Sequence, residues 1–329
     1  MIFTKIPNNL ASYQEPLVYE FECGAEEEAL DSVEVKILHP DGSLLARKML
    51  HSIESVMAID IAPYLRQALP PTMVAMPESE GVVDAPYNID VVIEVLGQSS
   101  EGRRFVAAKG ADNGPLVVLN EQIKHRTMTY DEFDTIGLLK TGNSLVEVVI
   151  DAFDKSSPIG YLNYEVEGVG QKVVYVRPAE FDSTLRSMVV TILCDGEPIE
   201  SIEYEVRKNL STAERIGWLN EHLAPEFYTF PLRKSLLIEA TRRRMASIWG
   251  KEAAAVEQRN ELKLISAYEP EAQIKALSRI LSSEKVWLQR GAEAEAVELS
   301  TQRVLIAPSD GVGFLELDLQ AAKRGVWLW

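Results

Sequence analysis

The histidines and the clustered acids are the residues of this chain whose types could do chemistry. The four histidines are scattered along the sequence, at His39, His51, His125 and His222. A metal site built from them would need a fold that gathers distant positions. His39 precedes a Pro-Asp-Gly turn and is interpreted as an exposed loop residue. His125 stands between two basic side chains, which disfavour a cation, so we predict no metal site.

Paired carboxylates are the second candidates. The segment YDEFD holds Asp131, Glu132 and Asp134, and Asp151 is followed closely by Asp154. A retaining glycosidase needs two carboxylates about 5 Å apart in a cleft, but with 50 acidic residues any two can be nominated. YDEFD also lacks the alternating Asp pattern and the glycine of an EF-hand calcium loop. We interpret these acids as solvated loop residues.

Motifs of common enzyme classes do not occur in the sequence. It contains no GxGxxG, GxxxxGK[ST], HExxH or GxSxG pattern, and these patterns mark nucleotide-binding, metalloprotease and hydrolase sites. We therefore predict no catalytic residues, no cofactor and no metal ligands, and we expect a protein that is not an enzyme.

Large aromatic side chains gather in residues 217–232, GWLNEHLAPEFYTFPL. Pro225 and Pro231 prevent this stretch from forming one uninterrupted regular element. Two interpretations are open for such rings: they stack on sugars, or they fill a sandwich core or a seam between domains. The residues considered for sugar stacking are Tyr130, Phe133, Trp218 and Tyr228.

Composition restricts the class of partner. The chain has 33 basic and 50 acidic residues, a net charge of −17, which repels nucleic acid and anionic membranes. We interpret the basic cluster Arg242–Arg244, with Arg233 and Lys234 nearby, as a solvated face. No run approaches 18 apolar residues, so no membrane span is predicted. The N-terminus shows no signal-peptide pattern, and we expect synthesis in the cytoplasm without classical export.

Hydrophobic alternation predicts antiparallel strands through the first 210 residues. Within residues 17–23 the apolar Tyr19, Phe21 and Cys23 alternate with glutamates, and within 32–38 apolar residues fall at every second position from 33 to 37, as in half-buried strands. Asp41-Gly42 then predicts a tight hairpin. We expect a short helix at Pro63 and a polar loop over 70–86. The cysteines Cys23 and Cys194 lie in such alternating runs and are interpreted as small buried hydrophobes, with a disulfide left open.

The spacing of the strands predicts the domain organisation. Short strands at intervals of about ten residues favour β-sandwich domains of about 100 residues. We predict a mainly β protein with tandem antiparallel β-sandwich-like domains over 1–112 and 113–212, and a C-terminal α+β domain over 213–329. In the last domain, 269–281 predicts a helix and 251–259 favours one by propensity, whereas 234–247 is ambiguous.

A resemblance emerges from the C-terminal third. The order Trp218-Leu219-Asn220, a spacer and Phe227-Tyr-Thr-Phe230 resembles a segment of tail-associated and other structural proteins of bacteriophages and prophages. Residues 272–288, AQIKALSRILSSEKVWL, are similar to a later helix-containing run of such proteins, and VEVKIL, DGSLLARKM and MAIDIAPYLRQAL resemble their front end. Leu223-Ala224-Pro225 departs from the glycine-rich spacer expected there. The resemblance implies no catalytic residues.

The resulting hypothesis is a non-enzymatic tail- or baseplate-type assembly component, incorporated into a virion and working as a homo-oligomer or with other tail proteins. A carbohydrate-binding or adhesin-like sandwich module is the alternative. Tryptophan and tyrosine often anchor interfaces, so the aromatic clusters are the candidate contact residues, either between domains or between molecules. These residues are Trp218, Phe227, Tyr228, Phe230, Trp327 and Trp329.

Overall fold

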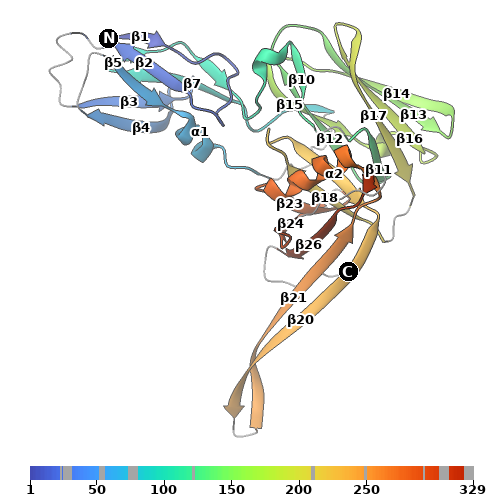
Figure 1. The fold of residues 1–329 in the computed structure, drawn as a ribbon. Helices are drawn as coiled ribbons and strands as arrows, with labels where there is room; N and C mark the ends of the chain where they lie inside the picture. Colours follow the sequence, from blue (N-terminus) through green and yellow to red (C-terminus); the bar gives the residue numbers. More distant parts are fainter. Residues whose placement is uncertain are drawn as a thin grey trace.

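The computed structural model describes residues 1–22, 24, 32–51, 56–72, 81–120, 123–208, 212–247, 250–291, 293–303 and 311–321. This part of the chain is mainly β and is arranged in three modules, which we call the first sandwich, the second sandwich and the C-terminal module (Figure 1). The predicted fold class of antiparallel β-sandwich-like domains followed by an α+β region is confirmed.

The first sandwich packs a three-stranded sheet against a second sheet built around β3 and β7. Alternate side chains of β3, among them Val33 and Val35, face Tyr19 and Phe21 of β2 in one core. The short helix predicted at Pro63 is α1, Ala62–Ala68. The strands are β1 Ile2–Lys5, β2 Val18–Glu22 and β5 Val56–Asp60 in one sheet, and β4 Leu44–His51, β3 Ser32–Leu38, β7 Ile89–Val95, β8 Gln98–Ser99 and β9 Arg103–Phe105 in the other.

The second sandwich packs a four-stranded sheet on a five-stranded sheet. The sheet orders are β10-β12-β15-β6 and β11-β17-β16-β13-β14, and β11 pairs with β17 in parallel while the other pairs are antiparallel. The strands are β10 Leu116–Val118, β12 Asp134–Lys140, β15 Gly170–Val176, β6 Val82–Asp84, β11 His125–Thr129, β17 Glu197–Arg207, β16 Ser187–Cys194, β13 Val146–Asp154 and β14 Ser157–Glu165.

Strand β6 comes from the stretch 70–86 that was predicted to be a loop. It precedes the predicted domain boundary at 112, yet it pairs with β15 of the second sandwich, with Val83 opposite Val173. Buried Cys194 fits its interpretation as a small hydrophobe and is a free cysteine, whereas Cys23 lies outside the described residues.

The C-terminal module is one seven-stranded antiparallel sheet with a helix packed on it. The helix predicted at 269–281 is α2, Glu271–Ser278, followed by a 3-10 turn, η4 Arg279–Ser282. Its Leu277 shares a core with Trp218 and Leu264 of the sheet. The sheet order is β19 Pro225–Phe230, β18 Glu214–Leu219, β23 Val286–Arg290, β24 Glu293–Leu299, β26 Glu316–Ala321, β21 Gly250–Ile265 and β20 Leu232–Ser247; Glu269–Pro270 and Val312–Gly313 form the small β22–β25 pair.

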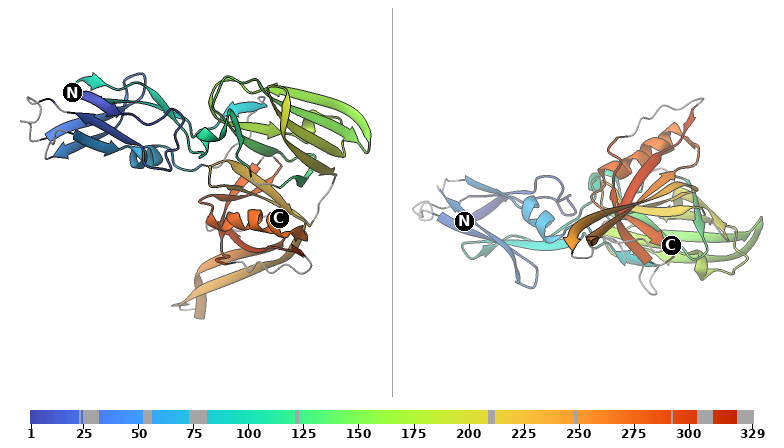
Figure 2. Two further views of the ribbon diagram at one scale, coloured as in Figure 1. Left: turned by 45° about the horizontal axis from the view of Figure 1, so that its top comes forward. Right: turned by 90° about the horizontal axis from the view of Figure 1, so that it is seen from below.

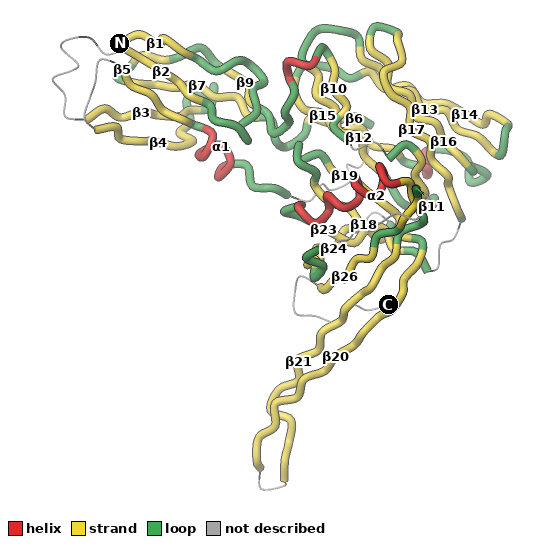
Figure 3. Tube along the Cα trace, viewed as in Figure 1, coloured by secondary structure: helices red, strands yellow, loops and turns green. Residues whose placement is uncertain are grey.

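The helix expected over 251–259 is wrong, because these residues lie in β21. Strands β20 and β21 pair along almost their whole length, from Leu232 opposite Ile265 to Ser247 opposite Gly250. The facing backbone edges of the two strands pair with each other, and the base of β21 also pairs with β26. This strand pairing takes the place of the helix that the alanines and glutamates favour by propensity. Figure 3 shows the two strands as one ribbon that extends away from the body of the molecule.

Strand β12 is missing from the sequence-based expectations for a different reason. All seven of its residues are buried, so it has no alternation of apolar and polar side chains to indicate a strand. Among the described residues, no helix is long and apolar enough to cross a membrane.

Two buried tyrosines predict how the fold responds to alkali. Burial raises the pKa of Tyr19 and of Tyr175 from 10.0 to about 12. The unfolded chain releases these protons near pH 10 while the folded chain retains them. The contribution of these two tyrosines to the free energy of unfolding is therefore expected to be constant below pH 10 and to fall between pH 10 and 12. The loss is roughly 2–3 kcal/mol per tyrosine.

Urea unfolding at pH 8, 10 and 12 measures this loss. Tyr19→Phe keeps the ring and removes the titrating hydroxyl, so its stability should fall less steeply above pH 10. Tyr161→Phe changes a surface-exposed ring and serves as the control. Equal slopes for the wild type and Tyr19→Phe would contradict the prediction.

Candidate functional site

Four of the six predicted contact residues lie inside the chain. Trp218 and Phe230 are fully buried, and Phe227 and Tyr228 are buried as well. Trp218, Tyr228 and Phe230 belong to the core of the C-terminal module, where the rings of Tyr228 and Phe230 pack edge to face. In this conformation their side chains are covered by the chain itself, so the burial of these four residues favours the interpretation as contacts within the chain. Trp327 and Trp329 lie outside the described residues.

Phe227 instead forms part of a seam between the second sandwich and the C-terminal module. Its ring contacts Phe133, which precedes β12, with 5.4 Å between ring centroids, and Trp287 of β23 at 5.7 Å. Phe133 in turn contacts Tyr175 of β15 at 6.0 Å. The interdomain-seam interpretation of the aromatic cluster therefore fits Phe227, whose neighbours come from both modules.

The rings considered for sugar stacking do not form an exposed platform. Phe133, Trp218 and Tyr228 are buried, and the half-buried Tyr130 donates its hydroxyl hydrogen bond to the carbonyl of Phe181 at 2.6 Å. Stacking on a sugar needs an exposed ring face, so these four residues offer no glycan site in this conformation.

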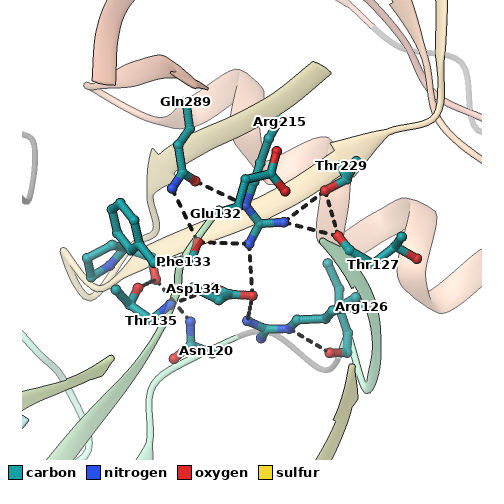
Figure 4. A network of polar contacts seen from close by, with 12 residues as sticks. Asn120, Arg126, Thr127, Glu132, Phe133, Asp134, Thr135, Arg215, Thr229 and Gln289 are labelled. Atoms are coloured by element: carbon teal, nitrogen blue, oxygen red, sulfur yellow. Dashed lines mark hydrogen bonds and ion pairs between the residues drawn. The ribbon is translucent and has the colours of Figure 1, made fainter. Parts of the chain in front are cut away.

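A buried ionic cluster lies beside the aromatic seam (Figure 4). The carboxylate of Asp134 is fully buried, and one oxygen, Oδ2, lies 3.1 Å from both Arg126 Nη1 and Arg215 Nη2. Asp134 and Arg126 belong to the second sandwich, whereas Arg215 is on β18 of the C-terminal module. A charge buried without a partner is very costly, so these three residues fasten the two modules together.

Arg215 makes further hydrogen bonds across the same seam. Its Nη1 donates to Thr229 Oγ1 at 2.8 Å and to the Thr127 carbonyl at 3.2 Å, and its Nε donates to Gln289 Oε1 at 3.0 Å. Thr229 Oγ1 also donates to the Thr127 carbonyl at 2.6 Å. The guanidinium is thereby held by partners from both modules, as Figure 4 shows.

The electrostatic setting keeps Arg126 charged. Burial opposes its charge, but Tyr204, Asp134 and Glu226 more than offset this effect, so the pKa of Arg126 lies above its ordinary value. The interpretation of the YDEFD acids as solvated holds for Asp131, which is exposed, and is wrong for Asp134. Glu132 has a local role, because its Oε2 accepts a 2.7 Å hydrogen bond from the Thr129 backbone N–H.

The turn that joins β18 to β19 reaches both other modules. Its His222 carbonyl accepts a hydrogen bond from Gln171 Nε2 at 2.9 Å, and the Lys109 backbone N–H donates to His222 Nδ1 at 3.3 Å. Burial lowers the pKa of His222. The Glu221 carbonyl accepts from Gln14 of the first sandwich at 2.9 Å. His222 is therefore a packing residue at the junction of the three modules.

The four histidines are not brought together by the fold. His39 and His51 belong to the first sandwich and His222 to the β18–β19 turn, while the imidazole of exposed His125 lies 3.0 Å from the Glu203 carboxylate. Within the described ranges, no group of three or more His, Cys, Asp or Glu side chains is arranged to hold a metal ion.

The β20–β21 hairpin, which we call the arm, is the second candidate site. Only residues 261–265 of β21 pair with β26, and β20 is the last strand of its sheet. Residues 238–260 therefore pair only within the arm, apart from the two positions at its tip that the structure does not describe. The left view of Figure 2 agrees with Figure 1 that the arm projects beyond the rest of the molecule. At 3.3 Å per residue each strand is about 50 Å long.

The sequence matches no family model and no curated protein significantly. Among solved structures, the BSP domain of a biofilm associated protein matches with 10% identity and a TM-score of 0.16 over 63% of this chain and 30% of that chain. This chain thus spans under a third of that structure. DIP-gamma IG1+IG2 matches with 10% identity and a TM-score of 0.20, over 63% of this chain and 96% of that chain. Titin domains I67–I69 match with 7% identity and a TM-score of 0.20, over 80% of this chain and 92% of that chain. We draw no functional assignment from likenesses this weak.

Proposed function

We propose that this protein is a non-enzymatic structural component of a multi-subunit assembly and acts through contacts with further copies of itself. The observation that carries the proposal is the arm. Its outer 23 residue positions, 238–260, have no strand partner outside the hairpin in the described structure. A two-stranded ribbon is marginally stable in water on its own, because it buries too little apolar surface to offset the entropy of ordering its chain. A second molecule would supply the missing contacts.

The seam supports the same proposal. Ion pairs and aromatic contacts fix the C-terminal module on the second sandwich, so the arm projects from a rigid base and has a defined direction. A rigid base reduces the entropy lost when the arm binds. This arrangement suits a building block whose geometry must be the same in every copy.

The particle that we propose is a phage or prophage tail or baseplate, assembled from proteins made in the cytoplasm. This finer proposal rests on the sequence resemblance of residues from Trp218 onward to tail-associated proteins. The adhesin-like alternative draws on the same stacked β-sandwich architecture, but the buried state of Phe133, Trp218 and Tyr228 removes the sugar-stacking residues it was based on.

Shortening the arm tests the assembly proposal. Leu237 and Glu261 lie opposite each other, so replacing residues 238–260 by Asn-Gly closes a short hairpin with a favoured two-residue turn. The pairing of β21 with β26 is retained. We expect the full chain to form oligomers whose mass rises with concentration in light scattering. The shortened chain should remain a folded monomer, whose circular dichroism differs only by the loss of the arm's strand signal.

Asp195→Asn provides a matched control, because Asn-Gly keeps the two-residue turn between β16 and β17 and leaves the arm intact. This variant should associate like the wild type. A full-length chain that stays monomeric at millimolar concentration, or a shortened chain that associates equally well, would overturn the proposal.

A further inference from the structure

The outer face of the five-stranded sheet in the second sandwich has no cover from the described parts of the chain. Along its strands, side chains alternate between the core and this outer face. Tyr161 on β14 is 72% exposed. Val149 on β13 and Val189 on β16 lie half-buried on the neighbouring strands of the same face. The face therefore combines an apolar centre with a large exposed ring, which is the composition of an interface core.

Carboxylates surround this apolar centre. Glu147 lies opposite Glu165, and Asp151 lies opposite Tyr161, in the pairing of β13 with β14. Glu203 and Glu205 lie on the same face of β17, alternating with the core residues Tyr204 and Val206. Arg207 is paired with Glu205 at 2.9 Å. The face is therefore acidic and favours a basic partner.

The arm has the opposite charge. Residues 232–265 contain eight basic and four acidic residues, whereas the rest of the chain contains 25 basic and 46 acidic residues. The arm is thus a long element whose net charge is positive in a strongly acidic protein. Complementary charge favours the encounter of such surfaces and suppresses wrong pairings.

The root of the arm adds apolar contacts of the same kind as the acidic face. Tyr268 is 74% exposed, and its ring packs edge to face on that of Phe314 at 5.6 Å. Leu232 and Leu237 are exposed on the first residues of β20. Exposed rings and leucines beside a charged ribbon match the apolar centre and acidic border of the sheet face.

We propose that the acidic outer face of the second sandwich binds the arm of a second copy of this chain. This inference rests on the assembly function proposed above and names the receiving surface. The contact is heterologous, because two acidic faces brought together would place carboxylates opposite carboxylates. A copy that gives its arm to one neighbour and receives an arm from another extends a ring or an open helical array, whereas two copies that exchange arms reciprocally form a closed dimer.

Charge reversal on the face tests this contact. Glu165→Lys with Glu203→Lys is expected to weaken self-association at least about tenfold at low salt. A control pair, Glu22→Lys with Asp112→Lys, changes the net charge equally at exposed positions of the first sandwich and the following turn. It should alter the association constant by less than about twofold. Analytical ultracentrifugation at 50 mM and 300 mM salt measures both pairs.

Combining the face variant with the shortened arm separates the two proposals. If arm and face form one contact, the shortened chain stays monomeric at both salt concentrations, with or without the face reversal, whereas face reversal alone weakens the association of the full-length chain. Association that needs the arm but is unchanged by face reversal would overturn the face as receptor and leave the assembly function standing. Equal loss in the control pair would also overturn it, because the effect would then follow net charge alone.

Discussion

Asp134→Asn is expected to lower the free energy of unfolding by about 3–5 kcal/mol, the cost of breaking a buried ion pair by removing one partner. The amide keeps the shape of the side chain but removes the charge that Arg126 and Arg215 share at 3.1 Å. Both guanidiniums are almost completely buried and stay protonated. They would then face each other without an anion at this position.

Because Arg215 belongs to β18 and Arg126 to β11, the variant should also weaken the coupling between modules. Calorimetry should show the C-terminal module melting apart from the second sandwich, where the wild type unfolds them together. Asp112→Asn, at an exposed turn position, controls for the loss of one carboxylate. A loss of stability below about 1 kcal/mol, as for an exposed pair, would contradict the buried-anchor role of Asp134.

Gly217→Ala is the second substitution with a large expected effect. Gly217 lies on β18 between Phe227 of β19 and Trp287 of β23. A Cβ at this position would overlap the indole of Trp287 and lie only 2.7 Å from the ring of Phe227. Both rings are buried and packed edge to face on each other, so neither can move without disturbing the seam. We expect a loss of about 1–3 kcal/mol from overpacking.

The melting temperature and the near-ultraviolet circular dichroism of the Trp287 environment would both report this change. Gly142→Ala is the matched control, since a Cβ added there would meet its nearest neighbour, Pro115 Cβ, at an ordinary 3.9 Å. If Gly217→Ala were as stable as Gly142→Ala, the close approach of the rings would not be a constraint on the fold.

Local patterns in the sequence were sufficient to predict the elements that have one exposed face. The alternation of β3 and the capping prolines of α1 and α2 indicated their structure directly. The buried strand β12 carries no such alternation. The strands of the arm could not be predicted from local sequence, because alanines and glutamates favour a helix unless a second strand pairs with them.

The anchoring role of Asp134 could not be predicted from its neighbours in sequence. Arg126 lies eight residues away, but Arg215 lies 81 positions further along the chain, and only the contact between modules brings it to Asp134. The aromatic density around Trp218 did indicate an important packing region. The burial of these rings within the chain results from β12, β19 and β23 packing together. No local sequence pattern predicts that packing.

The pairing of β6 with β15 has a consequence for dissecting this protein. A fragment that starts at residue 113 would lack Val82–Asp84 and would leave β15 with a bare edge, open to aggregation. Limited proteolysis within 85–112 should therefore yield pieces that stay associated until denatured. During synthesis on the ribosome, β6 is made roughly ninety residues before its partner strand β15. The pairing of β6 with β15 is therefore a long-range contact, and contacts of large sequence separation form slowly during folding.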